Sequence, residues 1–184
     1  MSNLTLILGG ARSGKSRYGQ ELATLEAQGR PVVYIATAQA GDDEMRDRIA
    51  RHRQDRPAEW RTVEEPLDVV GVLKRETDAG VILLDCLTFF VVNHMLSSGD
   101  PATCESDVWD AEGAEAAVRE LARVAQEVSP TVIVVSNEVG MGLVPETPLG
   151  RVFRDVAGRA NQETAAAATR VRFMVAGIPM AVKG

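Results

Sequence analysis

Residues 9–16 read GGARSGKS, that is Gly9, Gly10, Ala11, Arg12, Ser13, Gly14, Lys15 and Ser16. A glycine, four further residues and then Gly-Lys-Ser fit the Walker A pattern, in which backbone N–H groups and a helix N-terminus surround a chain of phosphates. Gly9 and Gly14 permit close backbone approach, Lys15 reaches the β- and γ-phosphates, and Ser16 is suited to bind the Mg²⁺ ion of a nucleotide. The stretch predicts a nucleotide-binding loop.

The surroundings of this loop decide between that prediction and a chance glycine-rich turn. An apolar run at residues 4–8 precedes the loop, and an amphipathic, helix-like segment begins near residue 14. A strand, a glycine-rich turn and a helix are the structural context in which the motif binds phosphate. The context therefore favours nucleotide binding.

Beyond the loop, apolar runs alternate with helix-like segments. Strands are predicted at 4–8, 32–36, 60–64, 81–85 and 131–135, and helices at 43–55, 67–76, 87–96, 111–127 and 149–168. Continuously apolar strands that alternate with helices are typical of a mostly parallel sheet with helices on both faces. The tail, residues 171–182, predicts a C-terminal hairpin at a sheet edge, and residues 97–105 predict a mobile loop. The fold class is α/β.

The composition is that of an ordinary globular protein. The 184 residues, 45% hydrophobic and 25% charged, predict one domain over 1–184, and the net charge of −6 argues against nucleic acid as a main partner. No apolar run approaches the ~18 residues of a membrane span, so we expect no integral membrane segment. The two cysteines, Cys86 and Cys104, lack metal-ligand spacing, which favours a reduced, cytoplasmic protein.

Ligands of parallel α/β sheets bind outside the carboxyl ends of the strands, so residues there are the leading site candidates. Asp85 ends an apolar strand, where a Walker B acid would bind Mg²⁺; the alternative is an N-cap for the next helix. Glu64 and Glu65 end another strand, where an exposed acidic turn is an equal alternative. The remaining candidates at strand ends are residues 37–39 and 136–138.

His52 lies in the charged helix predicted at 43–55. It continues the side of Met45 and Ile49, at positions i, i+4 and i+7, and is therefore expected to face the protein body. The arginines around it favour phosphate binding, and a neutral imidazole is a nucleophile. From the residues alone, a structural histidine is the stronger interpretation of His52, as it is of His94.

Eight strings along the chain resemble the bifunctional adenosylcobinamide kinase/adenosylcobinamide-phosphate guanylyltransferase of cobalamin biosynthesis. They are GGARSGKS at 9–16, YIATAQ at 34–39, DDEMRDRIARHRQDRP at 42–57, WRTVEEP at 60–66, LLDCLT at 83–88, VSNEVGMGLVPE at 135–146, FRDVAGRANQ at 153–162 and VAGIP at 175–179. The resemblance spans nearly the whole chain. It is more specific than the Walker A pattern, because the strings are unusual and keep the family's order.

This resemblance implies a RecA-like P-loop NTPase fold, a homotrimer, and two reactions. The first phosphorylates adenosylcobinamide with ATP or GTP, and the second transfers GMP from GTP, through a histidine-bound intermediate, to give adenosylcobinamide-GDP. By motif, His52 would carry the guanylyl group, with Lys15 as the second catalytic residue and Ser16 and Asp85 at Mg²⁺. The nucleotide contacts implied are residues 9–16, Thr37, Ala38, Gln39, Arg53, Gln54, Asp55, Arg56, Glu64 and Asp85.

Three other classes of protein share single features with this chain. A small-molecule kinase would use the loop and Asp85, but would leave the string around His52 without a purpose. A GTP-regulated switch protein would carry an Asn-Lys-x-Asp motif, which the sequence lacks. A RecA-type DNA motor would need basic loops to bind the DNA backbone, and the acidic composition of this chain, with a net charge of −6, does not favour them.

Overall fold

The computed structural model describes residues 3–54, 56–97 and 109–184. Asp55, Cys104 and most of the predicted mobile loop lie outside the described residues. The strands are β1 (Leu4–Gly9), β2 (Val32–Ala36), β3 (Arg61–Glu64), β4 (Val81–Asp85), β5 (Thr131–Asn137), β6 (Arg170–Val175) and β7 (Ile178–Lys183). The helices are α1 (Lys15–Ala27), α2 (Asp43–Gln54), α3 (Val69–Arg75), α4 (Leu87–Leu96), α5 (Ala111–Glu127) and α6 (Pro148–Ala167).

The strands form one sheet in the order β3-β2-β4-β5-β1-β6-β7. Every neighbouring pair is parallel except β6 and β7, which form an antiparallel hairpin at the sheet edge. Both the α/β class and the edge hairpin are thus confirmed. Because the carboxyl ends of parallel strands share one edge, Gly9 lies opposite Asn137, and Ala36 lies between Asp85 and Glu64.

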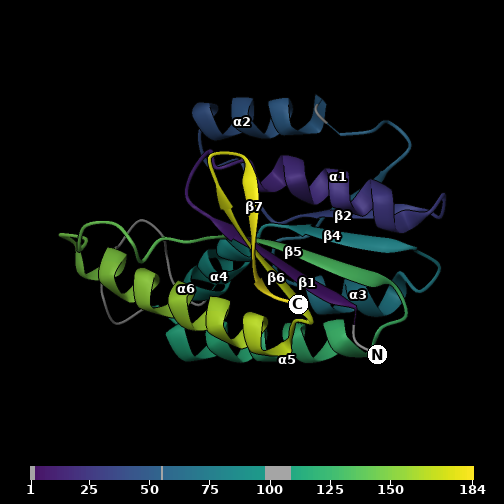
Figure 1. Ribbon diagram of the computed structural model, residues 1–184. Helices are drawn as coiled ribbons and strands as arrows, with labels where there is room; N and C mark the ends of the chain where they lie inside the picture. Colours follow the sequence, from purple (N-terminus) through teal and green to yellow (C-terminus); the bar gives the residue numbers. More distant parts are fainter. Residues whose placement is uncertain (1–2, 55, 98–108) are drawn as a thin grey trace.

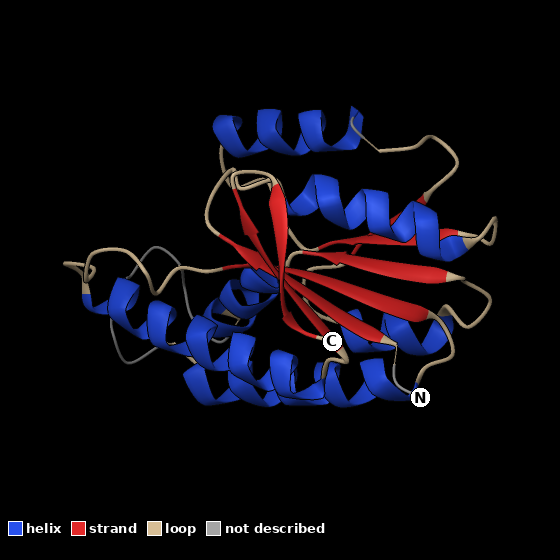
Figure 2. Ribbon diagram, in the orientation of Figure 1, coloured by secondary structure: helices blue, strands red, loops and turns tan. Residues whose placement is uncertain are grey.

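Helices cover both faces of the sheet (Figures 1 and 2). Along β1 and β4, Leu6 and Leu84 enter a large core with α3 to α6, whereas Ile7 and Leu83 enter a smaller core with α1. The inner strands β1, β2, β4 and β5 are largely apolar because both of their faces are buried, and each fully buried aliphatic side chain contributes about 1.5–3 kcal/mol. Helix α1 lies close to the sheet at Gly19, where a Cβ would meet Val135 Cγ2 at 3.2 Å.

Three helices begin at residues whose side chains cap them. Asp68, Asp110 and Thr147 accept hydrogen bonds from Gly71 N, Gly113 N and Gly150 N. Each such cap is worth ~1 kcal/mol, since it satisfies an N–H group that lacks a partner inside the helix. Helix α3 begins two residues later than predicted. The reason is that Glu65 Oε1 accepts from the N–H groups of Leu67 and Asp68, which holds those residues in a turn.

Helix α2 differs from the other helices in how it is held. Among its side chains that the structure describes, none is buried, and Met45, Ile49 and His52 are half-buried. The expected common side of these three residues is therefore confirmed. In Figure 1, α2 lies on the side of α1 that faces away from the sheet. A helix with so little buried surface is weakly fixed in position.

The last strand of the sheet is exposed to solvent. Ile178, Met180 and Val182 of β7 are exposed, so the last strand of the sheet carries an apolar surface. Among the described residues, no helix combines the length and apolar character that crossing a bilayer requires.

Candidate active site

The phosphate loop joins β1 to α1 at the carboxyl edge of the sheet. Gly14 is the N-cap of α1, with φ of 92°, a conformation that glycine adopts without strain. At Gly9, a Cβ would lie 2.6 Å from Ser13 Oγ and 2.8 Å from the carbonyl oxygen of Met174. Both glycines are therefore required by the shape of the loop, as the sequence predicts.

Lys15 folds back across this loop. Its side chain is buried, with 7% of the residue exposed, and Nζ donates to the carbonyl oxygen of Gly10 at 2.6 Å. Ser16 follows in the first turn of α1 and is half-buried. The ammonium group is thus held inside the loop, where an anion at the N-terminus of α1 would meet it.

The hydroxyl of Ser13 is buried and has no hydrogen-bond partner. A buried hydroxyl without a partner costs roughly 1–3 kcal/mol, so such groups are uncommon in folded proteins. A phosphate oxygen in the loop would accept its hydrogen bond. This unsatisfied group therefore fits a nucleotide at the loop.

The C-terminal hairpin supports the loop from outside. Gly177 N, in the turn between β6 and β7, donates to Ser13 O at 3.0 Å. A Cβ at Gly14 would lie 3.3 Å from Gly177 Cα, so loop and turn are in close contact. The sequence predicts the hairpin but gives no signal that it contacts the loop, because the contact joins backbone atoms more than 160 residues apart.

Asp85 ends β4 and does not cap the next helix. The N-cap of α4 is Cys86, so the alternative interpretation of Asp85 is wrong. Asp85 Oδ2 accepts a hydrogen bond from the Tyr34 hydroxyl at 2.7 Å. Burial, and then the negative charge of Asp85, raises the pKa of Tyr34 well above its usual value, so the phenol remains a donor.

Cys86 is the next residue, and its thiol is inert. The residue is 5% exposed. Burial, followed by the charge of Asp85, raises the pKa of the thiol to about 12. A thiol that stays protonated at neutral pH is a poor nucleophile and metal ligand.

Thr37 and Asn93 fix the ends of β2 and β4 relative to each other. Thr37 Oγ1 donates to Cys86 O at 2.7 Å and accepts from Cys86 N at 2.9 Å. Asn93 Nδ2, from α4, donates to Thr37 O at 2.8 Å and to Pro66 O at 3.1 Å. Thr37 is fully buried, and its hydroxyl holds the backbone at the ends of β2 and β4 in place. Ala38 beside it is half-buried and Gln39 is exposed.

Two arginines lie at the sheet edge, Arg53 in the last turn of α2 and Arg56 just after the helix. Arg53 Nη2 pairs with Glu64 Oε1 at 2.8 Å; both side chains are more than half exposed, so the pair contributes about 0–1 kcal/mol. Arg56 Cζ lies 3.6 Å from the centre of the Tyr34 ring. Arg56 Nε is buried without a hydrogen-bond partner. A guanidinium with an unused donor is well suited to an anionic ligand.

A buried polar network holds the end of β5. Ser136 Oγ donates to Asn161 Oδ1 of α6 at 2.7 Å, and Asn161 Nδ2 donates to Asn137 O at 3.1 Å. Thr88 Oγ1 of α4 accepts from the backbone N–H of Asn137 at 2.9 Å and from its side-chain amide at 3.1 Å. Residue pairs up to 49 positions apart are thereby joined beside the phosphate loop.

The structure thus brings the predicted loop, Asp85, Glu64 and the end of α2 to one edge of the sheet.

His94 packs edge-on against Phe90, with ring centres 4.4 Å apart, and its Nε2 lies 3.2 Å from Leu67 O; it is structural, as predicted. Gln54 is exposed. No group of three His, Cys, Asp or Glu side chains that could bind a metal occurs within residues 3–54, 56–97 and 109–184.

Three polar residues that shape the site are not predicted as site residues from the sequence: Tyr34, Asn93 and Asn161. Each is a polar side chain within an otherwise apolar strand or helix face. That pattern is a usable signal, because polar groups at buried positions require partners. Which partners they have depends on strand order, which the sequence does not specify.

The fold and the loop define a class of protein: a P-loop nucleotide-binding α/β protein of RecA-like topology. A KaiC-like protein of Pyrococcus horikoshii aligns over 94% of this chain and 70% of its own, with a TM-score of 0.52 and 13% identity. At that identity, the likeness concerns the fold alone.

Comparison of sequences identifies the family. Residues 5–182 match the family described as cobinamide kinase / cobinamide phosphate guanyltransferase. The bifunctional adenosylcobalamin biosynthesis protein CobP of Pseudomonas aeruginosa is 47% identical, over 97% of this chain and 96% of the relative. The corresponding CobU protein of Escherichia coli is 43% identical, over 98% and 99%. The chain belongs to this family, and is a bifunctional enzyme of cobalamin biosynthesis that uses nucleotide substrates.

Proposed function

We propose that the enzyme phosphorylates adenosylcobinamide with ATP or GTP, and then transfers GMP from GTP, through a bond to His52, to give adenosylcobinamide-GDP. The observation that carries this proposal is that two groups of side chains suited to bind anions lie at one edge of the sheet. One is the phosphate loop, with Lys15 and the unsatisfied Ser13 hydroxyl. The other is the segment that follows α2, with Arg56 and its unsatisfied Nε.

In the kinase reaction, the phosphate loop holds the β- and γ-phosphates. Lys15 offsets their charge, and Ser16 and Asp85 are the residues that would hold Mg²⁺, which neutralises the triphosphate when bound. The Tyr34 hydroxyl orients Asp85 through its 2.7 Å hydrogen bond. The hydroxyl of the corrinoid then attacks the γ-phosphorus. Binding and orientation supply most of the catalysis in such a reaction.

In the guanylyl transfer, His52 attacks the α-phosphorus of GTP. A nitrogen–phosphorus bond forms, the bond to the bridging oxygen breaks, and pyrophosphate leaves. Arg53, Arg56 and their neighbours Gln54 and Asp55 would contact the nucleotide, together with Thr37, Ala38, Gln39 and Glu64. The corrinoid phosphate then takes GMP from His52.

One nucleotide site must present two different phosphorus atoms in these reactions. The weak packing of α2 favours a shift of this helix, which would move His52 relative to the phosphate loop. The Arg53–Glu64 pair is exposed, and breaking it costs little free energy, so it would not oppose such a movement.

We further propose that the active form is a cytoplasmic homotrimer of one-domain chains, each spanning residues 1–184. The apolar surface of β7 supports association, because an exposed apolar edge strand is a usual subunit contact. A corrinoid is also large for one chain of 19.8 kDa to enclose beside a nucleotide. Light scattering should return about three times that mass, and an active monomer would contradict this proposal.

The test of function is a product assay with the purified chain. Adenosylcobinamide and ATP should give adenosylcobinamide phosphate, and further addition of GTP should give adenosylcobinamide-GDP and pyrophosphate. Formation of the phosphate without the second product would reduce the enzyme to a kinase. Formation of neither product would contradict the proposal.

A further inference from the structure

The acids at the carboxyl edge of the sheet have different partners, and one of them has no role in the account above. Glu64 pairs with Arg53, Glu65 holds the turn before α3, and Asp85 bonds to Tyr34. Glu138, the residue directly after β5, is half-buried. Its Oε1 accepts a hydrogen bond from Gly140 N at 2.6 Å.

Glu138 is tied directly to the phosphate loop. Its backbone N–H donates to Gly9 O at 3.0 Å, and Gly9 lies opposite Asn137 in the pairing of β1 with β5. The network of Thr88, Asn137 and Asn161 fixes the strand end from which Glu138 projects. The backbone of Glu138 is therefore held beside the loop that would bind the phosphates, and its carboxylate projects from that point.

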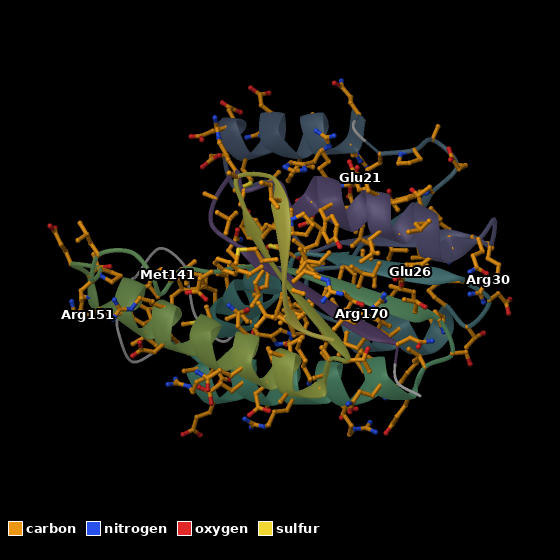
Figure 3. All side chains as sticks on the ribbon, in the orientation of Figure 1. Glu21, Glu26, Arg30, Met141, Arg151 and Arg170 are labelled. Atoms are coloured by element: carbon orange, nitrogen blue, oxygen red, sulfur yellow. The ribbon has the colours of Figure 1, made fainter. Side chains whose placement is uncertain are left out.

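An exposed apolar loop follows Glu138 immediately. Met141, Leu143 and Val144 are 80%, 95% and 65% exposed. The far end of this loop is fixed by Arg151, whose Nη1 donates to Pro145 O at 3.1 Å and to Glu146 O at 2.7 Å. Met141 and Arg151 lie at the same end of the molecule (Figure 3). Three large apolar side chains are thus presented to solvent next to an acid of the site.

We propose that residues 138–144 form the acceptor subsite of the kinase reaction, in which Glu138 takes the proton of the attacking hydroxyl and the apolar loop contacts the corrinoid. The inference rests on the proposed function. A corrinoid acceptor has the chemistry that this segment fits: a broad corrin ring with apolar methyl groups and polar amide side chains, one of which ends in the aminopropanol hydroxyl. The continuity of the apolar loop with Glu138 allows one molecule to reach both.

Glu138 acts as the base in the transfer of the γ-phosphoryl group to the acceptor hydroxyl. The O–H bond of the acceptor breaks and its proton passes to the carboxylate, while the oxygen bonds to the γ-phosphorus. The bond from that phosphorus to the bridging oxygen breaks, and its electron pair leaves with the nucleoside diphosphate. Glu138 then returns the proton to water. A carboxylate within hydrogen-bond reach of the hydroxyl can act in this way.

Glu138→Gln tests the proton transfer. The amide oxygen of glutamine can still accept from Gly140 N, so the turn is preserved while the proton affinity is lost. The kcat for phosphorylation of cobinamide should fall about 10²- to 10⁴-fold, with little change in KM for ATP. Glu138→Asp should recover part of kcat. Labelling of the chain by α-labelled GTP should persist.

Two results would overturn the assignment of Glu138. One is a kinase rate within threefold of the parent. The other is an equal fall in phosphorylation and in labelling, which would make Glu138 a structural residue. Failure of the unmodified chain to phosphorylate cobinamide would instead contradict the proposed function, so the two failures are distinguishable.

Leu143→Ser tests the apolar loop, with Leu25→Ser as the matched control. Leu25 is also an exposed leucine, 73% accessible, but it lies on α1. Leu143→Ser should raise KM for cobinamide at least fivefold and leave KM for ATP unchanged, and the control should change neither. Equal KM values for cobinamide in both variants would refute the contact. A change in molecular mass on light scattering, without a change in KM, would assign the loop to a second copy of the chain instead.

Discussion

The hydroxyl of Tyr34 and the carboxylate of Asp85 lie 2.7 Å apart, on neighbouring parallel strands, with the guanidinium of Arg56 against the face of the same tyrosine ring. One buried phenol therefore orients the acid proposed for Mg²⁺ and supports an arginine proposed for the nucleotide. The ring and the hydroxyl have separate functions, so they can be tested separately.

Tyr34→Phe should retain the ring contact with Arg56 and lose the hydrogen bond to Asp85. We expect the free energy of unfolding in urea to fall by about 1 kcal/mol and the Mg²⁺ concentration for half-maximal kinase activity to rise. Tyr18→Phe, at the chain's other tyrosine, is the control. If both variants have the same Mg²⁺ dependence, Tyr34 does not orient Asp85.

Lys15→Ala should weaken nucleotide binding. A charge-assisted contact is worth about 1.5–3 kcal/mol, which corresponds to a rise of roughly 10- to 150-fold in Kd for GTP, measured by calorimetry. Both reactions should slow together. Lys74→Ala removes an exposed lysine on α3 and should leave binding unchanged. Equal affinity of the two variants would contradict the phosphate-loop assignment.

Asp85→Asn should raise the Mg²⁺ requirement of the kinase reaction at least tenfold, because a neutral amide is a poor ligand for a hard cation. The fold should persist, since the amide oxygen can still accept from Tyr34. Asp68→Asn is the control, because asparagine caps a helix as well as aspartate does. A variant that melts earlier but works at the Mg²⁺ level of the parent would assign Asp85 a structural role only.

Stability should fall at alkaline pH. The ordinary pKa values of Cys86 and Tyr34 are 9.0 and 10.0, and burial raises both in the folded chain, that of Cys86 to about 12. Below pH 9 both groups are protonated in the folded and in the unfolded chain, so they do not make the free energy of unfolding depend on pH. Above it the unfolded chain loses protons that the folded chain keeps, and each group lowers the free energy of unfolding by up to about 1.4 kcal/mol per pH unit.

This slope is measured by urea unfolding between pH 9 and pH 12. Tyr34→Phe removes one of the two groups and should make the slope shallower in the upper part of this range. An identical slope in the parent and the variant would show that Tyr34 ionises equally in both states.

The sequence predicts most of this fold, because its inner strands are largely apolar and its breaks are marked by glycine and proline. The bounds of β2, β4, α4 and α5 are as predicted. The phosphate loop is also evident from sequence, since its chemistry lies in eight consecutive residues.

The parts that the sequence could not predict join distant segments. The pairing of Tyr34 with Asp85 requires that β2 and β4 be neighbours, and the contact of Gly177 with Ser13 requires that the hairpin fold back over the loop. Local patterns carry no information on either arrangement. The periodicity of Met45, Ile49 and His52 predicts which side of α2 faces the protein, but it does not predict which element lies against that side.

The most direct test of the central claim is covalent labelling of His52. Incubation with GTP labelled at the α-phosphate should leave label on the chain, stable to base and labile to acid, as a nitrogen–phosphorus bond is. Label at the γ-phosphate should not remain. His94→Ala, at the only other histidine of the sequence, should label like the parent, and His52→Ala should not label. Label that persists in His52→Ala, or that maps to Lys15, would contradict the account.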